Sequence, residues 1–410
     1  MTRIDAGPED VHEASACDGP RALLIEARDV PLGGVRGMEV RRILPHRDLP
    51  MVGAWCFLDR FGPQTTIMRV EPHPHIGLQT VTWPFVGEVH HRDSVDSDVV
   101  VTRGALNLMT SGGGISHSEY SVSDEPIALD ALQLWVALPE SRRHGDPAFE
   151  RHTDLPSLAL TTADGDPAGT ATVVMGELAG TVSPASAFSP LVGAEIALAA
   201  GSTARIPLRP DWEYALVGVF GEAIARAGVQ AGSAVPADED ASGAARPASN
   251  VPVGPQELLY LGVGRDHIDI TSPSPATLFL LGGEPFGDDL VMWWNFVGRT
   301  HDEIVEARDE WEAGSSRFGH VRGHGDERVP APPLPGVRLT PRRRRARPAS
   351  PCRRPPHRRG FSPAVAAPGS LRQGGSLTGC GPETPSRRAC CSCARRSVWR
   401  PGCSAVSRAG

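Results

Sequence analysis

Short apolar segments, cut repeatedly by Gly, Pro and Asp, run through most of this chain and constrain its fold more than any other feature. ALLIEARDV (22–30), MEVRRIL (38–44) and AWCFLDRFG (54–62) are typical of the first half. TATVVMGEL (170–178) and ATLFLLGGEP (276–285) continue the same style in the second half. Many short strands at regular spacing, with scarcely any helix, favour sandwiches or barrels. We therefore expect an all-β protein built as a duplicated β-barrel.

A short helix is predicted near the C-terminal end of this region. Thr300 is suited to cap its N-terminus, and Glu303, three positions on, completes a capping box. Ile304, Ala307 and Trp311 then fall on one face of the helix. The spacing predicts an amphipathic helix that follows the second barrel.

The composition divides the chain into four parts. Residues 1–21 are polar and are expected to be disordered, whereas residues 22–140 and 141–335 correspond to the two barrels. Residues 336–410 are rich in Arg, Pro and Cys and have no apolar periodicity, so they cannot build a core. A nucleic-acid-binding arm and a cysteine metal site are the functional interpretations of this tail. We favour a disordered extension, because its cysteines lack paired C-x-x-C spacing.

Charge is distributed as unevenly as composition. The chain carries a net charge of −7, but residues 341–410 hold 16 Arg against one acid, Glu383, so the preceding part is strongly acidic. An acidic body is not expected to bind nucleic acid or an anionic membrane directly. The sequence has no apolar run of about 18 residues, and its polar N-terminus lacks the apolar core of a signal peptide. Only Cys17 and Cys56 precede the tail, which agrees with a reducing compartment, and we expect a cytoplasmic protein.

Two pairs of ligand-type residues lie in strand-like segments of the first half. Side chains at i and i+2 of a strand face the same side, so His73 and His75 in EPHPHIGLQTVTW (71–83) point the same way. His117 and Glu119 repeat this spacing behind a run of three glycines. We predict that the two pairs meet inside the first barrel and bind a metal.

The predicted ligand set holds three imidazoles and one carboxylate. Mixed nitrogen and oxygen ligation suits Fe(II), Mn, Ni, Cu or Zn and does not select among them. An octahedral ion held by four ligands keeps two positions for a substrate and for O₂ or water. A single His-x-His pair can also be a polar patch on a strand, and it is the second pair that favours a metal.

Other histidines are weaker candidates. His90 and His91 are adjacent and face opposite sides of a strand, so they cannot share one metal. One of them can line the cavity, and the alternative is a hairpin rim. His267 and His301 are isolated in the second half, and we expect polar surface or helix-start positions for them and a second barrel without metal.

Three segments together resemble the pirin family of the cupin superfamily: HPHIGLQTVTW (73–83), GEVHHRDS (87–94) and LMTSGGGISHSE (108–119). LFLLGGEPFGDDLVMWWNFVGRTHDEI (278–304) is similar to the second pirin domain and its helix. The resemblance covers residues 22–335 and implies two jelly-roll-like cupin barrels face to face, with a mononuclear metal, usually iron, in the first barrel. The pirin ligands fall on His73, His75, His117 and Glu119. Gln79 departs from the family, which commonly has Glu there, and we expect it to change hydrogen bonding around the ligands without removing the site.

The resemblance implies quercetin 2,3-dioxygenase activity for some members. On this hypothesis Fe(II) binds a flavonol-like substrate and O₂ at its open positions, and Glu119 is the base that takes the proton of the substrate hydroxyl. A second hypothesis is a regulatory protein without turnover, in which oxidation of the iron changes the local charge and alters the surface that binds a protein partner. We expect a monomer on either hypothesis. A cupin that acts on an unrelated substrate is the third.

Overall fold

The computed structural model describes residues 19–31, 39–227 and 250–341. Residues 1–18 of the N-terminal segment that we predicted to be disordered, and the predicted tail from residue 342 on, lie outside the described residues. Within them the chain is all-β apart from one α-helix and one 3₁₀ turn, as predicted. No helix of the described part is long and apolar enough to cross a membrane.

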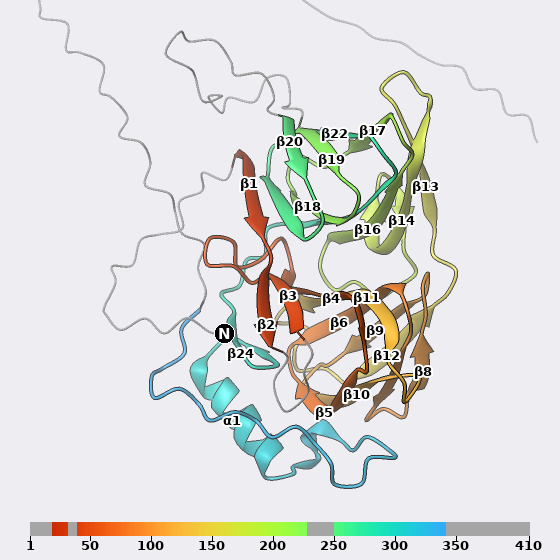
Figure 1. The fold of residues 1–410 in the computed structure, drawn as a ribbon. Coiled ribbons are helices and arrows are strands. Elements are labelled where there is room, and N and C mark those ends of the chain that lie inside the picture. Colours follow the sequence, from red (N-terminus) through yellow and green to blue (C-terminus); the bar gives the residue numbers. More distant parts are fainter. Residues whose placement is uncertain (1–18, 32–38, 228–249, 342–410) are drawn as a thin grey trace, which may run out of the picture. The chain divides into compact units, whose positions relative to one another are not determined.

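The first barrel is a jelly-roll-like pair of sheets (Figure 1). The seven-stranded sheet has the order β12-β9-β6-β11-β4-β3-β2, and its strands are β2 (Arg28–Pro31), β3 (Glu39–Leu44), β4 (Trp55–Thr66), β6 (Leu78–Val86), β9 (Leu106–Thr110), β11 (Ile127–Ala137) and β12 (Ala148–His152). The four-stranded sheet has the order β5-β10-β7-β8, and its strands are β5 (Arg69–His75), β7 (Val89–Asp93), β8 (Asp98–Val101) and β10 (Ile115–Ser121). All pairings are antiparallel.

The second barrel is one curled sheet of twelve strands. Its path runs β1-β21-β18-β23-β16-β14-β13-β17-β22-β19-β20, and β15 pairs with β14. The strands are β1 (Pro20–Glu26), β13 (Ser157–Thr161), β14 (Pro167–Leu178), β15 (Thr181–Val182), β16 (Leu191–Leu198), β17 (Ser202–Pro207), β18 (Glu213–Phe220), β19 (Ala223–Ala227), β20 (Asn250–Val253), β21 (Glu257–Gly262), β22 (His267–Ser272) and β23 (Ala276–Gly283).

One edge strand of each barrel comes from the other half of the chain. β1, before residue 140, pairs with β21 of the second barrel, and β12, after residue 140, pairs with β9 of the first. Strand β1 also begins at Pro20, inside the segment predicted to be disordered. The domain boundaries at residues 140 and 335 stay predictions.

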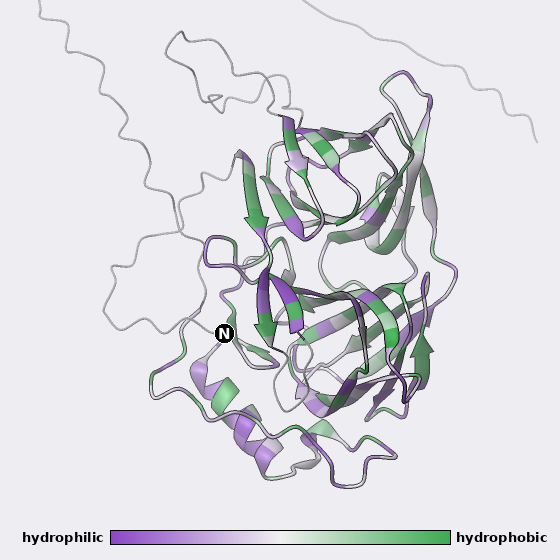
Figure 2. Ribbon diagram, viewed as in Figure 1, coloured by the Kyte–Doolittle hydropathy of each residue, from purple (hydrophilic) through white to green (hydrophobic). Residues whose placement is uncertain are grey.

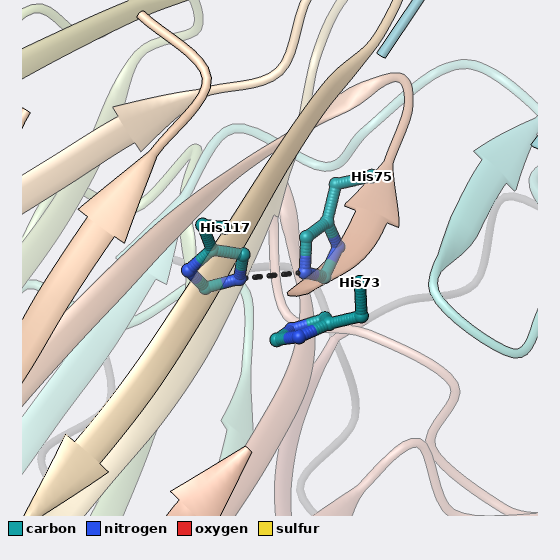
Figure 3. Close-up of side chains that lie close together, drawn as sticks. All are labelled: His73, His75 and His117. Atoms are coloured by element: carbon teal, nitrogen blue, oxygen red, sulfur yellow. Dashed lines mark hydrogen bonds between the residues drawn. The ribbon is translucent and has the colours of Figure 1, made fainter. Parts of the chain in front are cut away.

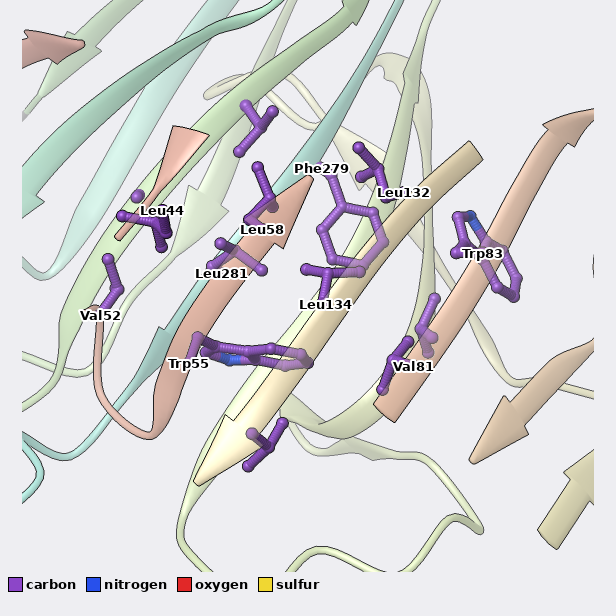
Figure 4. Close-up of a cluster of buried hydrophobic side chains, with 14 of the residues drawn as sticks. Leu44, Val52, Trp55, Leu58, Val81, Trp83, Leu132, Leu134, Phe279 and Leu281 are labelled. Atoms are coloured by element: carbon purple, nitrogen blue, oxygen red, sulfur yellow. The ribbon is translucent and has the colours of Figure 1, made fainter. Parts of the chain in front are cut away.

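A shared apolar core joins the two barrels. Strands of both halves contribute to it, and Figure 4 shows Trp55 and Leu134 of the first barrel beside Phe279 and Leu281 of the second. Trp55 is fully buried, and its indole Nε1 donates to the carbonyl oxygens of Val192 (3.0 Å) and Gly282 (3.2 Å). This core holds the first barrel's seven-stranded sheet from outside, which leaves the other face of that sheet for the barrel interior.

The C-terminal segment returns to the first barrel. It contains the hairpin β24 (Val291–Trp293) and β25 (Phe296–Gly298), the helix α1 (His301–Glu312) and the 3₁₀ turn η1 (Ser316–Phe318). Helix α1 is capped as predicted, since the Thr300 side chain accepts from the backbone N–H of Glu303. Figure 2 shows α1 as mostly hydrophilic with hydrophobic patches, in agreement with its three predicted apolar residues being the buried ones.

Candidate metal centre

Neighbouring strands bring the predicted histidines together. β5 and β10 pair antiparallel in the four-stranded sheet, with His117 directly across from His73 and Ile115 across from His75. Because both strands keep the two-residue alternation here, the three imidazoles share one face of the sheet. Figure 3 shows the rings of His73, His75 and His117 converging from these two strands.

The three rings are close enough to bind one metal ion. Ring centroids lie 4.3 Å apart for His73 and His117, 5.0 Å for His75 and His117, and 5.1 Å for His73 and His75. The Nε2 atoms of His75 and His117 are 3.0 Å apart. One ligand nitrogen from each of the three histidines lies within 4.8 Å of the others, and all three side chains are buried.

Hydrogen bonds on the far side of the rings fix which nitrogen carries the proton. A carbonyl oxygen can only accept, so His73 donates from Nδ1 to the carbonyl of Glu71 (2.9 Å) and His75 donates from Nδ1 to that of Asn295 (3.1 Å). In the neutral rings Nε2 is then the atom with the lone pair. Asn295 lies in the turn between β24 and β25, so the C-terminal segment orients one of the predicted ligands.

His91 orients the third imidazole. Its Nε2 donates to the Asp93 carboxylate (3.1 Å), which leaves Nδ1 of a neutral His91 to accept from Nδ1 of His117 (3.3 Å). The Asp93 carboxylate is itself held by the backbone N–H groups of Val95 (3.0 Å) and Ser97 (2.9 Å). His75 and His117 therefore direct Nε2 lone pairs toward each other, and a ring nitrogen of His73 lies within 4.8 Å of theirs.

His91 was not among the predicted site residues. The sequence showed that His90 and His91 face opposite sides, and the structure places His91 inside, directly across from Glu119. His90 points outward and bonds Asp98 (2.5 Å). The buried positions of β7 are Val89, His91 and Asp93, and this alternation is the signal that could have identified His91.

Glu119 lies beside this cluster rather than in the group of three histidines. Its carboxylate forms a second, overlapping group with His91 and His117, again with ligand atoms within 4.8 Å of one another. The register of β10 against β5 shifts between His117, which is paired with His73, and Glu119, which is paired with Val70. The structure thus brings three of the four predicted ligands together, and the role of Glu119 as the fourth stays a prediction.

Burial controls the protonation of the cluster. It lowers the pKa of both His75 and His117 well below the ordinary value of 6.5, and the neighbouring histidines lower it further. Burial also raises the pKa of Glu119, an effect that His91 and a hydrogen bond with Thr82 partly offset. Neutral imidazole is the form that binds metals, and a set of histidine rings beside a carboxylate fits Fe(II), Mn, Ni, Cu and Zn alike.

An aromatic wall faces the histidines across the barrel. Phe57 and Trp135 are stacked with centroids 3.9 Å apart, and the Trp135 ring meets the His75 ring edge-on at 5.2 Å. Further along, the Phe149 ring stacks on His91 at 4.9 Å. These contacts show that the four-stranded sheet and the seven-stranded sheet enclose the site between them.

Gln79 does not take the place that its sequence position suggested. Its amide nitrogen donates to the Thr110 hydroxyl (2.9 Å) and to the Ser186 carbonyl oxygen (3.1 Å), on the face of β6 that packs toward the second barrel. On the same face, Val81 and Trp83 belong to the core shared by the barrels. The expected change in hydrogen bonding around the ligands is therefore wrong for this side chain, because the strand turns it away from them.

The second barrel is lined differently. Its interior cluster is made of apolar residues such as Ile196, Ile270 and Leu280. His267 bonds the neighbouring Asp266 (2.6 Å), and His301 begins α1, where its Nδ1 accepts from the backbone of Leu339 (3.1 Å). Both lie at the surface or helix-start positions expected for them.

Two antiparallel barrels in one chain, with a histidine cluster inside the first, define a bicupin. Two family models match this chain, the pirin model over residues 37–136 and the pirin C-terminal cupin model over residues 193–319. A "pirin-like protein" of Caulobacter vibrioides is 33% identical over 76% of the chain and 99% of its own length. The chain belongs to the pirin family.

Two further relatives have a name that includes an activity. A Pseudomonas aeruginosa protein named as a candidate quercetin 2,3-dioxygenase is 41% identical over 76% of the chain and 90% of its own length. The crystal structure of a quercetin 2,3-dioxygenase from Acinetobacter baumannii matches with a TM-score of 0.67 and 35% identity, over 78% of this chain and 98% of that one. These matches support a pirin-like cupin for which a dioxygenase activity is a candidate.

Proposed function

We propose that the first barrel holds one Fe(II) ion and that the protein is a quercetin 2,3-dioxygenase-type oxygenase. The observation that carries the proposal is the convergence of three histidine ring nitrogens, with Nε2 of His75 and Nε2 of His117 only 3.0 Å apart. Lone pairs at this distance repel each other, and a cation between them turns the repulsion into ligation. His73, His75 and His117 would hold the ion, with Glu119 as a fourth ligand.

Iron in this position would supply the redox chemistry that joins O₂ to an activated ring. The residues of this chain do the rest. Glu119 would take the proton of a substrate hydroxyl, and its raised pKa, which makes it a stronger base than an exposed carboxylate, supports this role. Once protonated, Glu119 can donate to the Thr82 hydroxyl, which donates in turn to the Gln133 side chain (3.0 Å).

The walls of the site suit a flat aromatic substrate. Phe57 and Trp135 already stack on each other next to His75, and aromatic side chains favour offset or edge-on contact with another ring. The names of the two dioxygenase relatives point to a flavonol as that ring system. The four predicted ligands are all buried, with His73 and Glu119 the most exposed at 7% each, so a substrate reaches them only by displacing the side chains that cover them.

The redox-sensing alternative has its own support. The outer face of β10 is in contact with the C-terminal segment: the Ser116 hydroxyl donates to the Phe318 carbonyl oxygen (2.9 Å), and the Ser118 hydroxyl bonds His324 Nε2 (2.9 Å). A shift of the strand that carries His117 and Glu119 would therefore reach a surface segment, where a protein partner could respond to it. A cytoplasmic location agrees with the buried Cys56, whose thiol donates to the Trp135 carbonyl oxygen and is not part of a disulfide. The monomeric state stays a prediction.

The test uses the full chain, loaded with Fe(II) without oxygen and then given O₂ and quercetin. We expect quercetin-dependent O₂ uptake and release of carbon monoxide in the wild type, and loss of both in His117→Ala together with loss of bound iron. A matched control is His267→Ala, which removes a histidine from the second barrel and should change neither. Iron-loaded wild type that consumes no O₂ with any flavonol would favour the sensing protein instead.

A further inference from the structure

Asn107 is a buried amide without hydrogen-bond partners. It lies in the middle of β9 and is 3% exposed. Neither its side-chain oxygen nor its side-chain nitrogen has a partner, and among the residues that the structure describes it is the one with two such atoms. Burying an amide in this state costs stability, so this position is unfavourable for the fold by itself.

The strand alternation directs this amide into the first barrel. Its neighbours Leu106 and Leu108 belong to the core shared with the second barrel, so Asn107 faces the opposite side of the sheet. Met109, which is on the same face as Asn107, is paired with Phe149, the residue whose ring stacks on His91. The amide therefore points into the space that also contains the histidine cluster.

A polar row connects Asn107 to the site. On the seven-stranded sheet Asn107 is paired with Thr82, and Thr82 with Gln133. Side chains directly opposite in an antiparallel pair lie about 5 Å apart at Cβ. Thr82 bonds Gln133 (3.0 Å) and Glu119, so the polar groups of these residues satisfy one another. Asn107 ends the row one strand further on and has no such partner.

The adjacent row on the same face is largely apolar. It runs through Met109, Thr80, Trp135 and Phe57, and Trp135 meets His75. A flat ring lying along this row, with its oxygens toward the histidines, would have another edge beside the polar row. An amide offers a donor and an acceptor side by side, and a phenolic hydroxyl needs both.

We propose that Asn107 is a substrate-binding residue that hydrogen-bonds a ring hydroxyl of a flavonol, remote from the oxygens that face the histidine cluster. The assignment rests on the proposed function, since it takes its ligand class from there. It goes further by naming the residue that distinguishes a polyhydroxylated flavonol from an unsubstituted one. The amide's missing partners are then supplied by the ligand.

The test measures, by fluorescence titration, the binding of two ligands to the metal-loaded full chain without oxygen. Quercetin carries additional ring hydroxyls, and unsubstituted flavonol keeps the neighbouring hydroxyl and carbonyl but lacks the others. In Asn107→Leu we expect quercetin to bind at least about tenfold more weakly and unsubstituted flavonol to bind as in the wild type. The thermal midpoint without ligand should stay the same or rise, because no hydrogen bond of the free protein is lost.

Two variants complete the design. Asn107→Ala, which cannot clash, is read in the same way and keeps the test valid if leucine prevents folding. Asn250→Leu changes an exposed asparagine on β20 of the second barrel and should alter neither affinity.

The outcomes separate this inference from the proposed function. Wild-type affinity for quercetin in both Asn107 variants, or an equal loss for both ligands with a lower thermal midpoint, would overturn the role of Asn107 and leave the flavonol substrate standing. A wild type that binds neither ligand would overturn the proposed substrate and this assignment together.

Discussion

His75 and His117 hold their Nε2 atoms 3.0 Å apart, while the Nδ1 atom of each ring is engaged by a group behind it. Two nitrogens bound to one ion at about 2.1 Å, with a right angle between them, are about 3 Å apart. The pair therefore has the separation of two adjacent ligands of an octahedral ion. The hydrogen bonds at the Nδ1 atoms keep each ring from rotating out of this arrangement.

His91 and His90 provide a matched pair of variants. His91→Leu removes the acceptor that holds His117 Nδ1, and loss of such a supporting contact typically weakens metal binding about 10- to 100-fold. His90→Leu changes the adjacent, outward-facing ring and should leave metal affinity within about twofold. Competition with a coloured chelator measures both, and equal affinities in the two variants would contradict the supporting role of His91.

Glu119→Gln separates binding of the ion from chemistry at the substrate. The three histidines form a group without the carboxylate, so the variant should keep its iron with reduced affinity. Loss of the base should lower the rate of flavonol oxidation by about 100-fold or more. Iron content by mass spectrometry and O₂ uptake at saturating iron give the two readouts. Full activity in the variant would exclude Glu119 as the base.

The metal-free protein should lose stability on acidification. Burial lowers the pKa of His75 and His117 well below 6.5. These two imidazoles therefore take up protons below about pH 6.5 in the unfolded chain but stay uncharged in the folded chain. The free energy of unfolding should then fall by about 1.4 kcal/mol per pH unit for each imidazole, and stay constant in this respect above that pH.

Urea unfolding at about pH 7 and about pH 5.5 measures this dependence. In His75→Gln one of the two contributions is removed, so the loss between the two pH values should be smaller than in the wild type. The same loss in both proteins would mean that other groups cause it.

Gly193 lets the Trp55 indole cross between the barrels. A Cβ at Gly193 would lie 2.8 Å from Cζ2 of Trp55, a ring that two carbonyl oxygens hold through Nε1. Gly193→Ala should lower the free energy of unfolding by about 1–3 kcal/mol, the usual cost of overpacking. Gly287→Ala, where a Cβ meets nothing within 4 Å, is the control. Similar urea midpoints in the two variants would show that the indole can move aside.

The elements whose information is local were predictable from the sequence. The i, i+2 spacing placed His73 and His75 on one face, and the Thr300 capping box located α1. The position of Glu119 was not predictable in this way. It depends on a register shift between β10 and β5, and the residue pattern of β10 alone does not reveal such a shift.

Contacts between distant parts of the chain were the other limit. His91 faces inward because β7 pairs with β10 in a register that sets it against Glu119, and the sequence left both faces of the His90–His91 pair open. The carbonyl oxygen that orients His75 belongs to Asn295, 220 positions further on. A backbone carbonyl has no signature in the sequence, so such a partner becomes visible only when the fold is known.

This last contact has a consequence for how the protein is made. Both strands that carry the predicted ligands have been synthesised by Ser121, yet the groups that hold them from outside, Asn295 and His324, come near the end of the described chain. A ribosome-bound first half therefore presents three imidazoles of which one lacks its orienting partner. On the proposed function, tight binding of iron would wait until translation has passed these residues, and iron taken up earlier would be held loosely and could be exchanged.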